Sequence, residues 1–304
     1  MDNWWLPLLE RDGLLLRDKA LLAVDPDRVL VALRSGRLRR VQRAVYLPRD
    51  VDLTPMVAAR AAILSCGVHQ AVASHETAGR VHGLALPPGR RREHVTVPVE
   101  LRRRDRKDLK FHTRTFSLGD VVAPDAVPIT SVARTAADLL SSLDRLQAVW
   151  VVDDLLRQRL CSRGEIAEVV RRWRGGVGVR VAAQRLDEVD GMAESILETA
   201  GRLALADASV PAPTAQYVVA APGGRIIARL DAAYPTLRTG IEYDGRRVHD
   251  APQALYRDRE RQNALVALGW TILRYTWWDV IEDPARFVAS VRNALQPRQG
   301  LRSI

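Results

Sequence analysis

Two runs of alternating residues near the end of the chain constrain its fold more than any other feature. In the first run, Ile226–Ala233, every second residue is apolar, which is the pattern of a β-strand with one buried face. In the second run, TGIEYDG, the apolar residues Ile241 and Tyr243 share one face in the same way. Tyr234 and Pro235 lie between the runs and favour a turn. The sequence therefore predicts an antiparallel β-hairpin.

The predicted hairpin gathers three carboxylates, although the chain carries a formal net charge of +10. Asp231 points away from the apolar face of the first strand, and Glu242 and Asp244 share one face of the second. Two carboxylates on adjacent strand ends supply the oxygen ligands that Mg²⁺ accepts, and bound Mg²⁺ activates water for attack on a phosphodiester. The alternative is a solvated edge salt-bridged to Arg229 or Arg246, and the three carboxylates alone favour this alternative.

The composition is that of a folded protein. The chain has 304 residues, 47% hydrophobic and 27% charged, which is enough to build two or three modest domains with cores. No apolar run has the length of a membrane span, and the first residues, MDNWWLPLLERDG, lack the features of a signal peptide. Cys66 and Cys161 match no metal spacing, so we expect reduced thiols in a cytoplasmic protein without membrane partners.

The basic excess is almost entirely arginine, because Lys19, Lys107 and Lys110 are the only lysines. Arginine forms bidentate contacts with phosphate and guanine, and a basic chain favours a polyanionic partner. The charge therefore indicates DNA as the partner. A GC-rich genome also enriches arginine, and this explanation stays open.

The pattern of elements predicts a multidomain α+β or α/β protein. We expect an N-terminal domain at residues 1–50, a mixed α/β domain at 51–182 and a last domain at 183–304. In the last domain the predicted order is helix (Met192–Leu205), two strands, helix (Ala254–Leu268), strand and helix. This order places the acidic hairpin between two helices.

Several ordered motifs of the last domain carry a family resemblance. The segments AESILETAGRLAL, RLDAAYP, IEYDGRRVHD and YRDRERQNALVALGWTILRYTWWDV resemble a domain family of uncharacterised bacterial proteins. That family is related to the very-short-patch repair endonucleases of the PD-(D/E)xK superfamily. The resemblance spans about Met192 to Leu295 and implies a restriction-endonuclease-like αβββαβ core. It also implies an endonuclease that hydrolyses DNA with Mg²⁺, or with Mn²⁺ in its place.

The resemblance assigns roles to single residues. Asp231 would be the metal-ligating aspartate and Glu242 the second acid, while Asp244 stands where many superfamily members have lysine. His249 stands where the short-patch relatives use histidines, and it would move a proton. Glu198 on the leading helix would orient a metal-bound water. The alternatives are a hydrogen-bonding loop role for His249 and an i,i+4 ion pair for Glu198.

Arg274 lies in the last predicted strand, beside the expected site, where it would contact a phosphate. Asp258, Arg261 and Asn263 on the preceding helix match the family pattern. We interpret these three as helix packing and a polar network. In the middle domain, His75 and His82 are expected to be structural, because their spacing along a predicted helix does not suit a metal.

The first domain is predicted to read DNA. Three short helices, the first being WWLPLLERDG, precede a basic β-hairpin, with Asp25 as N-cap and Pro26 at the first helical position of the third helix. This is the order of a winged helix-turn-helix. The segment ALRSGRLRRVQRAVYLP resembles the N-terminal domain of type IV antitoxins of the abortive-infection class, with Ala44 replacing a glycine. The expected DNA contacts are the arginines of the third helix and the wing, namely Arg28, Arg34, Arg37, Arg39, Arg40 and Arg43.

The two resemblances lead to two functions. The first is a Mg²⁺-dependent DNA endonuclease targeted by the winged helix. The alternative is a non-catalytic transcriptional regulator or antitoxin with a degenerate nuclease fold. DNA is a partner in both, and a toxin or a second copy of the chain is the candidate for a protein partner.

Overall fold

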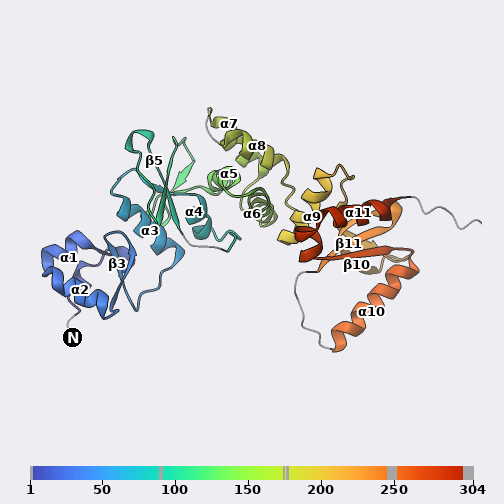
Figure 1. Cartoon of the computed structure of the whole chain (residues 1–304), viewed down its shortest axis with the longest axis horizontal. Coiled ribbons are helices and arrows are strands. Elements are labelled where there is room, and N and C mark those ends of the chain that lie inside the picture. Colours follow the sequence, from blue (N-terminus) through green and yellow to red (C-terminus); the bar gives the residue numbers. More distant parts are fainter. Residues whose placement is uncertain (1–2, 89–91, 174, 176–177, 245–251, 297–304) are drawn as a thin grey trace, which may run out of the picture. The chain divides into compact units, whose positions relative to one another are not determined.

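The computed structural model divides into two compact units (Figure 1). The first unit comprises Met1–Leu143 and Arg159–Asp187, and the second comprises Asp144–Gln158 and Glu188–Ile304. The structure describes residues 3–88, 92–173, 175, 178–244 and 252–296. Helix α6 (Arg145–Arg157) fell in the predicted middle domain, but it packs against helix α9 (Ile196–Asp207) and belongs to the second unit. Within the described residues, no helix has the length and apolarity to cross a membrane.

The beginning of the first unit contains two helices and a hairpin. Its elements are β1 (Leu15–Leu16), α1 (Arg17–Ala23), α2 (Pro26–Arg34), β2 (Leu38–Gln42) and β3 (Val45–Pro48). The strands form one sheet in the order β1-β3-β2. The predicted N-cap is confirmed, because the Asp25 side chain accepts the Asp27 backbone N–H at 3.1 Å and Pro26 opens α2. The hairpin turns at Ala44, whose φ is +60°.

The expected first helix is wrong. The segment forms two 3₁₀ turns, Leu6–Leu8 and Arg11–Gly13, instead of an α-helix. Asp12 has a φ of +67°, a left-handed conformation that interrupts helical geometry. Trp5 is nevertheless buried in the small core that α1, α2 and the sheet share. The segment therefore packs as the predicted helix would, without helical hydrogen bonding along its length.

The rest of the first unit is mixed α/β, as predicted. Its strands form a sheet in the order β6-β5-β4-β8-β7, in which β5 pairs in parallel with β6 and antiparallel with β4. The strands are β4 (Val72–Ala73), β5 (Glu93–Val97), β6 (Leu109–Thr113), β7 (Val121–Val122) and β8 (Ile129–Thr130). The helices are α3 (Pro55–Cys66), α4 (His75–Val81), α5 (Val132–Ser142), α7 (Arg163–Arg172) and α8 (Val179–Asp187).

The second unit has the order of the αβββαβ core that the resemblance implied, with one strand, β9, more than the residue pattern predicted before the second helix. After α9 come β9 (Thr214–Ala220), β10 (Ile226–Tyr234), β11 (Thr239–Asp244), α10 (Pro252–Ala267), β12 (Thr271–Thr276) and α11 (Pro284–Leu295). The four strands form one sheet in the order β12-β11-β10-β9. The predicted hairpin is confirmed: β10 and β11 pair antiparallel, and the 3₁₀ turn Pro235–Leu237 joins them. Strand β12 pairs in parallel with β11.

Helices cover this sheet on both faces (Figure 1). Ile241 and Tyr275 pack with Phe287 of α11 on the face where α9 also lies, and Leu265 of α10 packs on the other. Helix α9 approaches β11 very closely, because a Cβ at Gly201 would lie 2.2 Å from the Tyr243 hydroxyl oxygen. A glycine is therefore required where the helix crosses the strand that carries the predicted acids.

Candidate functional site

Asp231 lies where β10 and β11 stop pairing. The antiparallel ladder runs from Tyr234 opposite Thr239 to Ala232 opposite Ile241. One residue further on, the Asp231 carboxylate accepts the Tyr243 backbone N–H at 2.7 Å through Oδ2. The side chain thus takes the place of a backbone partner and is held at the point where the strands separate.

Glu242 is 8% exposed and is bound by two arginines. Arg261 of α10 donates to Oε1 at 2.6 Å and to Oε2 at 3.3 Å, and Arg274 of β12 donates its Nε to Oε2 at 3.0 Å. Asp258 accepts from Arg261 at 2.8 Å and lies 3.6 Å from Arg274. The predicted polar network on α10 is therefore built around Glu242. Two guanidinium groups neutralise the buried carboxylate, as buried charges require.

Glu198 occupies the first turn of α9. Its Oε2 accepts the Glu194 backbone N–H and the Gln216 side-chain amide, both at 2.9 Å. The alternative ion pair with Arg202 is wrong, because Arg202 binds Asp153 at 2.7 Å instead. Burial raises the pKa of the Glu198 carboxyl, and the negative charge of nearby Asp231 adds to this rise.

The electrostatics of Asp231 follow from its position. Burial raises the pKa of its carboxyl, the Tyr243 N–H opposes this rise, and the charge of Glu242 adds to it. The negative charge of Asp231 therefore interacts with that of Glu198 and with that of Glu242. The three acids do not form a tight ligand group, since among the described residues the three-way clusters within 4.8 Å include none of them.

Of the other two predicted acidic-site residues, Asp244 is exposed and His249 lies outside the residues that the structure describes. Asp244 is the exposed last residue of β11. His249, like Arg246, lies outside the described residues. Arg274 was expected to contact a phosphate. In the structure it binds Glu242 while its side chain stays 34% exposed, so it remains accessible to a ligand.

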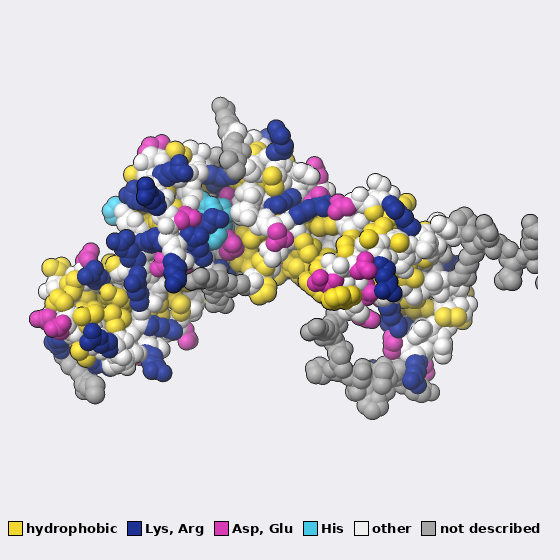
Figure 2. Space-filling view, in the orientation of Figure 1, with side chains coloured by type: hydrophobic (Ala, Val, Ile, Leu, Met, Phe, Trp, Pro, Cys, Tyr) yellow, Lys and Arg dark blue, Asp and Glu magenta, His cyan; other side chains and the backbone are white. Residues whose placement is uncertain are grey.

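The predicted DNA-binding arginines differ in their surroundings. Arg37 stacks on Trp5 with its guanidinium carbon 5.2 Å from the ring centre, and Arg39 donates to the Val51 carbonyl at 2.6 Å. Arg40 and Arg43 are exposed, and the structure describes no hydrogen bond or ion pair for either of them within the described residues. Arg28 and Arg34 are also exposed, on α2. Figure 2 shows lysine and arginine side chains gathered over the surface of the first unit.

The sequence did not indicate a cluster of three histidines in the first unit. His75, His94 and His112 each offer a ligand nitrogen within 4.8 Å of the others. Two of these residues lie in neighbouring parallel strands, and the third begins α4. Spacing along the chain could not reveal the cluster, because it depends on strand pairing. The expectation that His75 has only a structural role came from helical spacing alone, and the packing of its ring against His112 was not foreseen.

Part of the second unit matches a known protein family. Residues 225–295 match the family model REase_MTES_1575, a restriction-endonuclease-like family, and this range runs from β10 to α11. It contains Asp231, Glu242 and Arg274, whereas Glu198 precedes it. The second unit therefore contains a restriction-endonuclease-like domain.

The whole chain has relatives in Mycobacterium tuberculosis. The uncharacterized proteins Rv2248 of strain ATCC 25618 / H37Rv and MT2308 of strain CDC 1551 / Oshkosh are each 32% identical over 270 residues, which is 87% of this chain and 95% of the relative. The chain belongs to the family of these two proteins. The crystal structure of the RV2827C protein from the same species matches with a TM-score of 0.42 and 14% identity, over 70% of this chain and 85% of that chain.

Proposed function

We propose that the protein is a metal-dependent nuclease that hydrolyses phosphodiester bonds of DNA. The observation that carries this proposal is the position of Asp231, a half-buried carboxylate held by the Tyr243 backbone N–H where β10 and β11 stop pairing, beside the residue that follows Glu242. Both residues lie in the segment that matches the restriction-endonuclease-like family. Asp231 and Glu242 are the acidic pair of the proposed site.

The donor set suits Mg²⁺ in kind. Both acids offer carboxylate oxygens, which hard cations prefer, and the Tyr243 N–H engages one oxygen of Asp231. The raised pKa of Asp231 reflects a carboxylate that lacks a full positive counter-charge, and a cation would supply one. Asp231 and Glu242 would hold the ion, which when bound would polarise a phosphate oxygen and lower the pKa of a water. Mn²⁺ is the alternative ion.

The arginines at Glu242 have a second role in this proposal. Arg261 and Arg274 are 32% and 34% exposed, so their guanidinium groups are accessible from solvent. They would turn part of their hydrogen bonding from Glu242 to a bound phosphate, since guanidinium binds both anions through the same donors. In that position they would stabilise the charge that develops on the phosphate. Asp244 and Glu198 would support the site, and His249 would move a proton.

The first unit would deliver the DNA. We assign α1, α2 and the β2–β3 hairpin to a winged helix-turn-helix, in which α2 enters the major groove and the hairpin is the wing. The exposed arginines of this region suit contacts with the phosphate backbone. A toxin partner or a homodimer, and a cytoplasmic location, complete the proposal.

One observation favours a second candidate, a DNA-binding regulator with an inactive nuclease fold. Both oxygens of Glu242 are already bound by arginines, and the second unit contains no lysine. In such a protein Arg261 and Arg274 would only neutralise the buried acid. The two candidates share DNA binding and differ in whether a metal displaces an arginine from Glu242.

Cleavage of supercoiled plasmid separates the candidates. The wild type is incubated with Mg²⁺, Mn²⁺ or EDTA beside Asp231→Asn, a variant that keeps an acceptor for the Tyr243 N–H. If the protein is a nuclease, the wild type cleaves the plasmid with metal, and the cleavage rate of Asp231→Asn is lower by about 100-fold or more. Substitution of a residue that only supports metal ligands causes a smaller loss. Asp207→Asn is the matched control, because Asp207 is an exposed acid of α9 paired with Arg145. DNA binding without cleavage under all three conditions establishes the regulator.

A further inference from the structure

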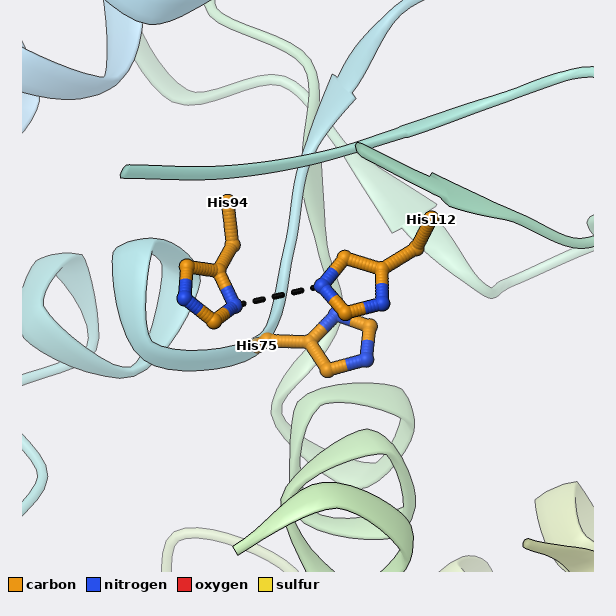
Figure 3. A group of neighbouring side chains, drawn as sticks. All are labelled: His75, His94 and His112. Atoms are coloured by element: carbon orange, nitrogen blue, oxygen red, sulfur yellow. Dashed lines mark hydrogen bonds between the residues drawn. The ribbon is translucent and has the colours of Figure 1, made fainter. Parts of the chain in front are cut away.

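Three histidines from separate elements meet in the first unit (Figure 3). His75 begins α4, His94 lies in β5 and His112 lies in the neighbouring strand β6. His112 Nε2 and His94 Nδ1 are 3.2 Å apart. Two nitrogens bound to a tetrahedral Zn²⁺ at about 2.0–2.1 Å lie about 3.3 Å from each other. The separation of the pair is therefore that of two ligands on one metal ion.

We propose that His75, His94 and His112 bind a divalent transition metal of the zinc type, with Glu76 as the adjoining carboxylate. This site is independent of Asp231 and Glu242, which lie in the other unit. Imidazole nitrogen is a preferred ligand of such metals, and a set of three histidines with one further ligand is a recurring zinc arrangement.

Glu76 provides a second observation that points to a cation. Its Oε2 is buried and lies 2.7 Å from His94 Nδ1. Glu76 Oε2 and His112 Nε2 both approach the same nitrogen of His94, which can carry at most one proton. A metal ion between these three atoms would satisfy all of them.

Two of the three rings pack in the way that neutral imidazoles do. The rings of His75 and His112 stack with centroids 3.5 Å apart, an arrangement that suits neutral imidazoles. Neutral rings keep a lone pair for coordination.

The surroundings position the rings and give access to them. Ser74 Oγ lies 2.9 Å from His75 Nδ1 and accepts the Thr96 hydroxyl at 2.8 Å, so a second layer of contacts orients this ring. A pocket of about 850 Å³ is lined by His75 and His112. It gives an ion a route to the cluster, and it gives His112, which is only half-buried, room to turn out of the stack toward a metal.

Metal content and affinity test this proposal. Tag-free full-length protein is treated with chelator, dialysed and titrated with Zn²⁺, and bound metal is measured by mass spectrometry. We expect one equivalent in the wild type and an affinity lower by about 100-fold or more in His94→Ala and His112→Gln. Because His94 is buried, circular dichroism is used to check that each variant folds. If His94→Ala does not fold, the Zn²⁺ affinity of His112→Gln, which changes a half-buried residue, tests the proposal.

Two control variants locate the metal. His69→Ala removes an exposed histidine of the same unit, and Asp231→Asn alters the acidic site. Both should keep the full equivalent of Zn²⁺. Visible absorption of the Co²⁺-substituted protein gives an independent readout, because nitrogen-rich tetrahedral sites absorb far more strongly than oxygen-rich octahedral ones. A wild type that binds no Zn²⁺, or a folded His112→Gln that binds it with unchanged affinity, would show a hydrogen-bonded histidine cluster only.

Discussion

The acidic site of the second unit and the histidine cluster of the first hold their ligand groups in opposite ways. Glu242 is a buried anion, and Arg261 and Arg274 neutralise it. His75 is buried and His112 is half-buried, and burial lowers the pKa of both rings. A metal that binds the acids must therefore compete with guanidinium groups. A metal that binds the histidines meets ring nitrogens, whereas Glu242 is already paired with two arginines.

This difference bears on selectivity. Mg²⁺ retains its water shell and accepts oxygen ligands, so it suits the carboxylates and binds them weakly while the arginines stay in place. Zinc-type ions accept nitrogen ligands and suit the histidines. We therefore expect the two units to respond to different ions.

Arg261→Met tests the competition at Glu242. The substitution keeps much of the side-chain volume and removes the bidentate partner of a buried acid. Breaking a buried pair costs about 3–5 kcal/mol, and the partial exposure of Arg261 and the remaining Arg274 reduce the expected loss to about 1–2 kcal/mol in EDTA. Mg²⁺ should bind more tightly than to the wild type and restore this stability by mass action. Urea unfolding with and without Mg²⁺ measures both effects.

The control for this variant is Arg259→Met, which removes an exposed arginine of the same helix. It should leave both the stability and the Mg²⁺ response unchanged. A destabilised Arg261→Met protein that gains nothing from Mg²⁺ or Mn²⁺ would contradict metal binding at Glu242 and favour the regulator.

Ser74→Ala tests how the histidine cluster is positioned. The variant removes the contact to His75 Nδ1 and leaves all three rings in place. Loss of such an orienting partner lowers metal affinity by about 10-fold or more. Zn²⁺ titration calorimetry measures the change, and Ser35→Ala, in an exposed position after α2, is the control. Unchanged affinity would mean that the rings orient themselves by stacking alone.

The two sites also differ in how far sequence could predict them. The alternation in Ile226–Ala233 predicted the strand, and the turn at Pro235 predicted the hairpin. The predicted single apolar face breaks near its end, because Ala228 and Leu230 pack in one cluster while Ala232 packs in the cluster on the other face of the sheet. The family pattern placed Arg261 in a polar network. Its contact with Glu242 depends on how α10 packs on the sheet, and no local pattern encodes that packing.

The histidine cluster shows where local reasoning ends. Thr96 of β5 stands opposite His112 of β6 in a parallel pair, which brings His94 to the same region. Parallel strands are joined by a long crossover, so no turn residue fixes their register. The prediction of a first helix was wrong for a different reason. The apolar residues of this segment do pack in a core, but Asp12 adopts a left-handed conformation that helix propensity does not predict.

Asp231→Asn tests the acidic site without metal. Because burial and Glu242 raise the pKa of Asp231, the carboxyl favours its protonated form in the folded state. Its contribution to stability is full at low pH and is lost as pH rises through the folded-state pKa. The asparagine variant does not have this loss. We expect its melting temperature in EDTA to exceed that of the wild type by about 2–4 °C near pH 7 and to equal it near pH 4. A gain that does not depend on pH would contradict the assignment.

The arginines of the β2–β3 hairpin in the first unit differ in their contacts with the rest of the protein. Arg37 and Arg39 make contacts inside the protein, whereas Arg40 and Arg43 have no described hydrogen bond or ion pair within the described residues. Arg43 also lines a pocket of about 580 Å³ together with Arg106. The hairpin and the basic run that contains Arg106 are therefore neighbours on one surface.

Salt dependence of duplex binding measures what these arginines contribute. Each phosphate contact adds about −0.9 to the slope of log affinity against log salt. Arg40→Ala with Arg43→Ala should therefore flatten the slope by up to about 1.8, and Arg37→Ala with Arg39→Ala should flatten it less, because those side chains have partners within the protein. The variant without all four arginines gives the slope that remains when the hairpin makes no phosphate contact. If this slope equals that of the wild type, DNA binds the run from Arg102 to Lys110 instead, and the hairpin is not a wing that contacts DNA. If the slope flattens more when Arg40 and Arg43 are removed than when Arg37 and Arg39 are removed, the hairpin binds the phosphate backbone through its exposed arginines. These variants leave the residues of the acidic site and of the histidine cluster unchanged, so cleavage and Zn²⁺ binding can be measured in the same proteins.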